Sequence, residues 1–209
     1  MTTLMILGAS GLVGKSLLTQ ALAHPDIAQV VAPGRAPLPA HTKLIAPVVD
    51  FERLPADEAW WQVDTLACAL GTTLRAAGSR EAFRRVDHAY PLASARIARE
   101  RDVGTFVLVS AAGANAASSA FYSRTKGELE RDLMTLGFRS LTFVRPSLLG
   151  GTRTQVRPME SAGITLLGAI GPMLPRRYRV VAAEHVARRV LQAALASPPG
   201  LRVIESEAI

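Results

Sequence analysis

The stretch GASGLVG, residues 8–14, separates the apolar run LMIL at 4–7 from a segment whose apolar residues recur at helical spacing. This order is typical of a strand, a tight turn and a helix. In such a turn Gly8 permits the sharp reversal, and Gly11 lets an anionic group approach the backbone. Gly14 allows the helix to pack closely on the strand.

Apolar runs and helical patterns continue to alternate along the chain. Strands are predicted at 28–35, 43–50, 64–73, 104–111, 140–146 and 201–206, and helices at 80–102, 119–136 and 183–197. Strands that are apolar on both faces and are followed by helices indicate a parallel sheet covered on both sides. We therefore expect an α/β fold, a doubly wound parallel sheet of the Rossmann type. Pro91 lies inside the longest helical pattern and should bend or break it.

A glycine loop at the start of a helix is suited to the pyrophosphate of a dinucleotide. Free backbone N–H groups and the helix dipole both favour an anion at that position. The residues predicted to contact the cofactor there are Gly8, Ala9, Ser10, Gly11, Leu12 and Val13.

The residue that follows the second strand, about 20 positions after the glycines, usually reads the 2′ position of the ribose. An acidic residue there would favour NAD. The sequence APGRAPL has no acidic residue but has Arg35, and an arginine matches a 2′-phosphate. The sequence therefore predicts NADP in preference to NAD.

A second motif overlaps the glycine loop and supports an alternative of a different class. The residues ASGLVGKS, 9–16, nearly match the phosphate loop of nucleotide triphosphatases, with Ala9 in place of the first glycine. In that case Lys15 would hold the β- and γ-phosphates, and Ser16 and Asp50 would bind magnesium. This alternative leaves the first two glycines of the loop unexplained.

Three side chains with complementary chemistry are predicted to meet at one edge of the sheet. Ser110 ends the strand at 104–111, and ligands bind at the carboxyl edge of such sheets. Tyr122 and Lys126 lie four residues apart at the start of the next helix, which places them on one helix face.

The three residue types fit proton transfer at a carbonyl or alcohol oxygen. A tyrosine has a reference pKa of about 10, and a nearby ammonium favours the phenolate and lowers that pKa. Tyr122 could then exchange a proton with an oxygen that Ser110 holds, while hydride moves to or from a nicotinamide.

The regular alternation stops after the strand at 140–146. Residues 147–180 are rich in Gly, Pro and Arg, and long irregular insertions usually carry function. The sequence therefore predicts one NAD(P)-binding Rossmann-like domain over 1–209, with 147–180 as a small C-terminal substrate lobe.

The chain resembles the short-chain dehydrogenases/reductases, in particular the atypical group that includes the Tat-interacting-protein-like oxidoreductases. The resemblance rests on the glycine loop and on segments that follow it in a specific order. These are Arg35, Asp50, CALGTT (68–73), RVDHAYPLASARIA (85–98), VLVSAAGA (107–114), FYSRTKGELE (121–130) and VRPSLLGG (144–151).

The resemblance implies an NADP-dependent oxidoreductase and assigns roles to individual residues. Ser110, Tyr122 and Lys126 match the family's catalytic serine, tyrosine and lysine, and the last two also contact the cofactor. Further contacts are implied with the adenine ring at Asp50, with the ribose at Leu70, Gly71 and Thr72, and with the nicotinamide at Pro146.

The chain departs from the family pattern in the helix before the fifth strand. Typical members carry an asparagine there, whereas the nearby polar residues of this chain are Asp87 and His88. Atypical relatives include proteins that bind cofactor with weak catalysis. An NADP(H)-binding regulatory or redox-sensing protein with little or no turnover is therefore the second hypothesis.

The composition and charge of the chain narrow the classes of partner that it is expected to bind. The net charge is +7, but the arginines form no basic stripe and aromatic residues are few, which argues against nucleic acid. Four scattered histidines show no metal-ligand spacing. The apolar run at 163–174 is too short to span a bilayer. The chain has a single cysteine, Cys68, and its N-terminus does not resemble a signal peptide. Both features favour a cytoplasmic location. We expect a small-molecule substrate, whose identity the sequence leaves open together with the oligomeric state.

Overall fold

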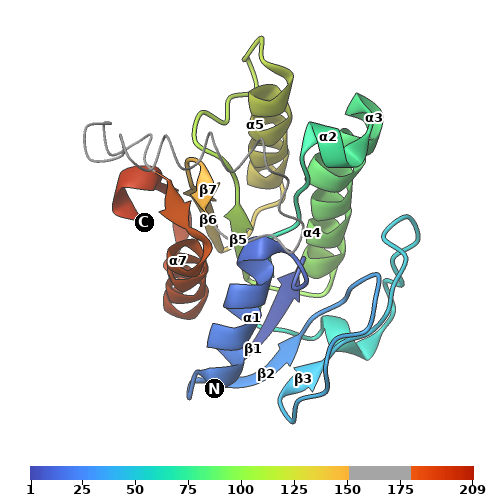
Figure 1. Ribbon diagram of the computed structural model, residues 1–209. Coiled ribbons are helices and arrows are strands. Elements are labelled where there is room, and N and C mark those ends of the chain that lie inside the picture. The colour runs from blue at the N-terminus through green and yellow to red at the C-terminus, as the bar shows by residue number, and fades with distance from the viewer. Residues whose placement is uncertain (151–179) are drawn as a thin grey trace.

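A seven-stranded parallel sheet forms the centre of the molecule in a computed structural model, which describes residues 1–150 and 180–209 (Figure 1). The strand order is β3-β2-β1-β4-β5-β6-β9. The strands are β1 (Thr2–Leu7), β2 (Ile27–Val31), β3 (Leu44–Ile45), β4 (Thr65–Cys68), β5 (Thr105–Val109), β6 (Ser140–Arg145) and β9 (Gly200–Glu205). The order reverses between β1 and β4, and this is the position where open α/β sheets bind ligands.

Helices cover both faces of the sheet, as the apolar runs predicted. On one face α1 (Leu12–Ala23) and α7 (Ala183–Ala196) lie side by side, and on the other lie α4 (Tyr90–Glu100) and α5 (Phe121–Met134) (Figure 1). The short elements are η1 (Ala59–Trp61), α2 (Leu74–Ala77), α3 (Arg80–Arg84), η2 (Arg85–Ala89), η5 (Ser206–Ala208) and a two-stranded ladder of β7 (Leu149–Gly150) with β8 (Val181–Ala182).

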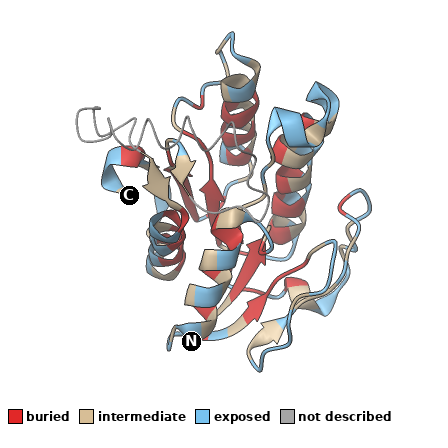
Figure 2. Cartoon of the chain, in the orientation of Figure 1, coloured by how far each residue is buried: buried red, intermediate tan, exposed pale blue. Residues whose placement is uncertain are grey.

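Each face of the sheet contributes to its own apolar core. In β1, Leu4 and Ile6 pack with α1 and α7, whereas Met5 and Leu7 pack with the opposite layer of α4, α5 and η1. Successive side chains of a strand point to opposite faces, so a strand that is buried on both sides must be apolar throughout. Figure 2 shows the central strands and the inner faces of the helices buried, whereas the edge strands β3 and β9 contain no buried residue.

Two predicted elements differ in extent from the structure. The run at 43–50 forms only the two-residue strand β3, and beyond it the chain keeps a single bridge between Gly34 and Val48. Pro47 lies next to that bridge and has no N–H to donate to a sheet ladder. The run at 64–73 leaves the sheet after Cys68.

The interruption expected at Pro91 takes the form of a change in helix winding. Residues Arg85–Ala89 form the π-helical segment η2 between α3 and α4, and the N–H of Tyr90 donates to the carbonyl of Arg85, five residues back. Proline cannot supply the next helical hydrogen bond, and such π segments are frequent at functional sites.

The proposed substrate lobe at 147–180 lies almost entirely outside the described residues. Its ends at 147–150 and 180 enter the β7–β8 ladder.

Candidate functional site

The glycine loop occupies the turn between β1 and α1 and packs against the end of β4. Gly8 has φ +81°, and a Cβ on it would lie 2.7 Å from the carbonyl oxygen of Ala69. A Cβ on Gly14 would lie 1.9 Å from the carbonyl oxygen of Gly8, so only glycine fits either position. The first and third glycines thus have the roles that the sequence analysis gave them.

The N-terminus of α1 offers unpaired N–H groups. Its cap residue Gly11 provides no side chain, and the first turn contains no acidic residue. Ser10 and Gly11 are exposed, whereas Ala9 and Val13 are buried and Leu12 is half-buried. The exposed residues leave the helix dipole open to an anion.

Arg35 and Asp50 follow β2 and β3 at the same carboxyl edge of the sheet. Both are exposed. The carboxylate of Asp50 accepts a hydrogen bond of 2.9 Å from the N–H of Glu52. Within 1–150 and 180–209, Arg35 forms no ion pair, so its guanidinium is available to a ligand.

The segment Leu70, Gly71 and Thr72 follows β4 and crosses a buried ion pair. The N–H of Thr72 donates to Oδ2 of Asp87 at 2.8 Å. A Cβ on Gly71 would lie 3.4 Å from Oδ1 of Asp87 and 3.7 Å from Nζ of Lys126. The proposed ribose-binding segment therefore lies directly over Lys126 and Asp87.

Lys126 and Asp87 form the ion pair beneath this segment. Nζ of Lys126 lies 2.7 Å from Oδ1 of Asp87, and the two side chains are 5% and 1% exposed. Burial lowers the pKa of the Lys126 ammonium, but Asp87, Tyr122 and Cys68 together outweigh burial and raise this pKa above its ordinary value. Burial raises the pKa of Asp87, and the Lys126 ammonium opposes that rise.

Tyr122 projects from the first turn of α5 at the rim of the site. Its side chain is 40% exposed, and its ring packs on Phe83 with ring centroids 5.7 Å apart. The sequence predicted that Lys126 lowers the pKa of Tyr122, but the net shift is upward. Partial burial raises the pKa of the phenol, the Lys126 ammonium lowers it, and the Asp87 carboxylate raises it again.

Ser110 ends β5 as predicted, but its hydroxyl is already engaged. It donates to Oε1 of Glu130 at 2.5 Å, and Glu130 is held by Nε and Nη2 of Arg145 at 3.0 and 2.6 Å. Arg145 also donates to Glu205 at 2.9 Å. A carboxylate between an arginine and a hydroxyl is ionised and accepts only, so the hydroxyl proton points to Glu130.

Two residues of the site have roles that sequence reasoning missed. Tyr122, Lys126 and Glu130 follow one another at four-residue spacing, which places all three on one face of α5. Continuing the four-residue spacing of Tyr122 and Lys126 by one more step along the sequence would have found Glu130. Asp87 was noted only as a departure from the family pattern, because nothing in the sequence pairs it with Lys126.

Pro146 is buried after β6, and its carbonyl accepts a hydrogen bond of 2.8 Å from the N–H of Ala112. This bond ties the chain after β6 to the chain after β5. Pro146 therefore lies beyond the end of β6, next to the segment that begins at Ser110.

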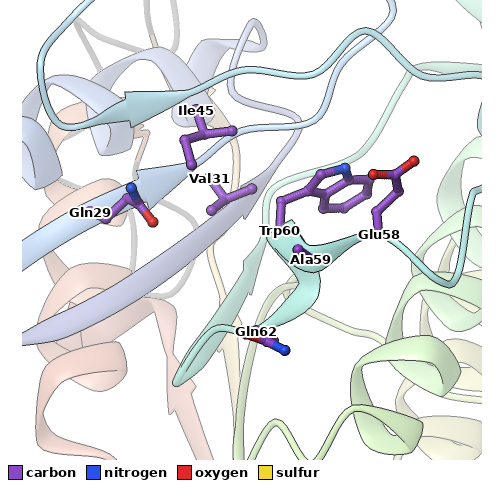
Figure 3. Close-up of a pocket in the computed structure, with 7 residues that line it drawn as sticks. All are labelled: Gln29, Val31, Ile45, Glu58, Ala59, Trp60 and Gln62. Carbon is purple, nitrogen blue, oxygen red and sulfur yellow. The ribbon is translucent and has the colours of Figure 1, made fainter.

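A pocket of about 390 Å³ lies elsewhere, between β2, β3 and η1 (Figure 3). Val31 and Ile45 line it from the strands, and Trp60 lines it from η1. Trp60 stacks on the fully buried Trp61 with ring centroids 4.8 Å apart. None of the predicted site residues lines this pocket, so we do not assign the site to it.

The triphosphatase alternative is poorly supported by the topology. Lys15 is exposed in the first turns of α1, and Asp50 follows β3, which β2 separates from the strand of the glycine loop. A second metal ligand would be expected beside that loop. Within the described part of the chain, no three His, Cys, Asp or Glu side chains are grouped to hold a metal.

The fold and the site define a Rossmann-type protein of the short-chain dehydrogenase/reductase class, and comparison with known proteins gives its family. The chain is 35% identical to protein HTATIP2 of Rattus norvegicus, with 99% of this chain and 87% of that protein aligned. It is 37% identical to protein fmp52, mitochondrial, of Aspergillus fumigatus, with coverages of 82% and 76%. The chain belongs to this family of atypical short-chain dehydrogenases/reductases, as the resemblance indicated.

One solved structure shows how widely the fold is shared. The structure of MoeE5 in complex with UDP-glucose and NAD aligns over 96% of this chain and 74% of that chain with a TM-score of 0.74, at 17% sequence identity. No protein-family model matches the chain.

The relatives correct one prediction from the sequence. The expected cytoplasmic location is wrong, because the fmp52 relatives, among them FMP52 of Saccharomyces cerevisiae, are described as mitochondrial. A lone buried cysteine distinguishes reducing from oxidising compartments but not one reducing compartment from another. Among the described residues, no helix is long and apolar enough to cross a membrane; the apolar run at 163–174 lies outside them.

Proposed function

We propose that the chain binds a nicotinamide dinucleotide, NADP in preference to NAD, and transfers hydride between it and a carbonyl or alcohol substrate. The observation that carries the proposal is the convergence of the glycine loop, the 70–72 segment and the Tyr122–Lys126 pair at one carboxyl edge of the sheet. This edge lies at the β1–β4 reversal, where such sheets bind ligands.

The cofactor would be held by three groups of residues. The open N-terminus of α1 suits the pyrophosphate, and the exposed Arg35 suits a 2′-phosphate. Gly71 carries no side chain over the ion pair and so leaves room above Lys126 for a ribose. The NAD bound to MoeE5, a protein of the same fold, supports a dinucleotide at this site.

The proton would be handled by Tyr122. When bound, the nicotinamide supplies or accepts the hydride. The partly exposed phenol would donate a proton to the substrate oxygen in reduction and accept one in oxidation. Lys126 lies one turn away and would stabilise the phenolate.

Replacing the tyrosine tests the proposed chemistry. Tyr122→Phe removes the proton carrier and keeps the ring packed on Phe83, so NADPH-dependent reduction of a panel of aldehydes and ketones should fall at least a hundredfold. NADPH affinity should change less than threefold. Tyr90→Phe is the matched control, since Tyr90 bonds to Glu52 outside the site. Equal turnover by Tyr122→Phe and wild type would remove Tyr122 from the mechanism.

A second candidate function, cofactor binding without turnover, is favoured by a specific observation. The proton of Ser110 points to Glu130, and the charge of Lys126 is balanced by Asp87. In this state the hydroxyl of Ser110 does not donate a hydrogen bond to a substrate carbonyl. A regulatory NADP(H)-binding protein would bind NADPH tightly yet reduce none of the carbonyl panel, and Tyr122→Phe would then change neither property.

A further inference from the structure

Asp87 connects the two segments that would face a cofactor. Its Oδ2 accepts the N–H of Thr72 at 2.8 Å, and its Oδ1 contacts Nζ of Lys126 at 2.7 Å. Each carboxylate oxygen therefore has one partner, and the side chain is 1% exposed.

The π-helical segment η2 fixes the position of this carboxylate. The segment spans Arg85–Ala89 and places Asp87 in the buried interior, while the next residue, His88, bonds to Asp132 at 2.8 Å on α5. A π turn shifts the register of the following side chains relative to a regular helix. The winding thus sets Asp87 against Lys126 and anchors η2 on α5 through a separate pair.

We propose that Asp87 is a positioning residue that holds Lys126 in a neutralising ion pair and thereby limits the effect of the Lys126 charge on Tyr122 in the cofactor-free protein. The proposal deepens the proposed function, on which it rests for the role of Tyr122. In this resting state the ammonium that would stabilise the phenolate is balanced by a carboxylate just as deeply buried.

Among the described residues, the charges around Tyr122 come from few elements. Lys126 lies on its own helix, and Asp87 faces it from η2. From β4 the thiol of Cys68 faces Lys126, and it is neutral because burial raises its pKa to about 12. From α3 the neighbour is the apolar ring of Phe83. The arginines Arg80 and Arg124 stack instead on the ring of Phe121.

Removing only the charge of Asp87 should therefore expose Tyr122 to the full effect of Lys126. In Asp87→Asn the amide keeps the shape of the side chain and can still accept the N–H of Thr72. The ammonium of Lys126, one helical turn from Tyr122, then lacks its counter-charge. An opposite charge within about 4–6 Å of an acid lowers its pKa by about one unit or more.

The test is a pH titration of the cofactor-free protein. The chain has three tyrosines, so ¹³Cζ-tyrosine NMR resolves few signals, and Tyr122→Phe assigns the one of interest. The titration midpoint of Tyr122 should fall by about one pH unit in Asp87→Asn, a tenfold rise in phenolate at a given pH. An unchanged or higher midpoint overturns the proposal.

Two further variants separate charge from folding. In Asp87→Asn/Lys126→Met both charges are gone, and the midpoint should stay within about half a unit of wild type, because the two charges oppose each other at Tyr122. A fall of a full unit in this double variant contradicts the proposal even if Asp87→Asn does not fold. Asp132→Asn removes the neighbouring carboxylate that pairs with His88, and it should leave the midpoint unchanged.

The titration needs neither cofactor nor substrate. A protein that shows the predicted midpoints but binds no NADPH would refute the proposed function and leave the role of Asp87 intact. A protein that binds NADPH but shows equal Tyr122 midpoints in wild type and Asp87→Asn would refute the role of Asp87 and leave the proposed function intact.

Discussion

Buried carboxylates engage two of the three residues predicted to be catalytic. Glu130 accepts a hydrogen bond from the hydroxyl of Ser110, and Asp87 balances the charge of Lys126. Both contacts are buried, where an unpaired charge or polar group is costly and a paired one is held firmly. At the residue scale, the structure therefore presents a site in which Ser110 and Lys126 are engaged before any ligand arrives.

Arg35 should determine which dinucleotide binds. Its guanidinium has no ion-pair partner among the described residues, and hydrogen bonds to a charged group contribute about 1.5–3 kcal/mol. Arg35→Ala should weaken NADPH binding at least tenfold and leave NADH binding nearly unchanged, as measured by fluorescence titration. Arg96→Ala, an exposed arginine on α4, is the control. Equal losses for NADPH and NADH would contradict this role.

The sequence predicted the positions of the site residues better than their contacts. The spacing of Tyr122 and Lys126 follows directly from the helical period, and the place of Ser110 follows from the end of its strand. The ion pair with Asp87 depends on the π-helical winding near Pro91, which no residue pattern specifies. The upward shift in the pKa of Tyr122 was missed because it comes first from burial of the phenol, which the residue spacing does not report.

At the scale of elements, α5 and η2 are joined by the buried Asp87–Lys126 pair and by the half-buried His88–Asp132 pair. Breaking a buried pair by removing one partner usually costs about 3–5 kcal/mol, because the remaining charge stays buried. Asp87→Asn should therefore lower the free energy of unfolding by about that amount, measured by urea denaturation.

A double-mutant cycle isolates this contribution. Asp87→Asn/Lys126→Met removes both charges, so its loss of stability should be clearly smaller than that of the single Asp87→Asn variant. A double variant less stable than the single would show that the two charges do not stabilise each other.

Most elements were predictable because the central strands β1, β4, β5 and β6 are largely buried on both faces and the long helices carry an apolar stripe. The largest error in extent was β3, where an apolar run of eight residues, 43–50, yields a strand of two. That run lies at the edge of the sheet and contains Pro47, so only one side offers pairing and one donor is missing. The apolar character of a run alone therefore does not predict where its strand ends.

At the scale of the whole molecule, the two apolar layers shield the only cysteine from solvent. Cys68 is fully buried at the end of β4, and burial raises its pKa to about 12. In the native protein it should react with a thiol reagent such as DTNB at least a hundredfold more slowly than in urea-unfolded protein. Rapid reaction of the native protein would contradict this burial.

The slow reaction expected of Cys68 also bears on regulation. A redox sensor based on a thiol needs an accessible thiolate, which the buried side chain does not provide. Any redox response of this protein is therefore expected to come through the oxidation state of a bound nicotinamide.

The most direct test of the account is a fluorescence titration of the wild-type protein with NADPH and, separately, with NADH. The account predicts saturable binding of NADPH that is tighter than that of NADH, since the glycine loop at α1 suits the pyrophosphate and Arg35 suits the 2′-phosphate. Tighter binding of NADH would contradict the role of Arg35. Binding of neither dinucleotide would contradict the central claim that this edge of the sheet is a cofactor site.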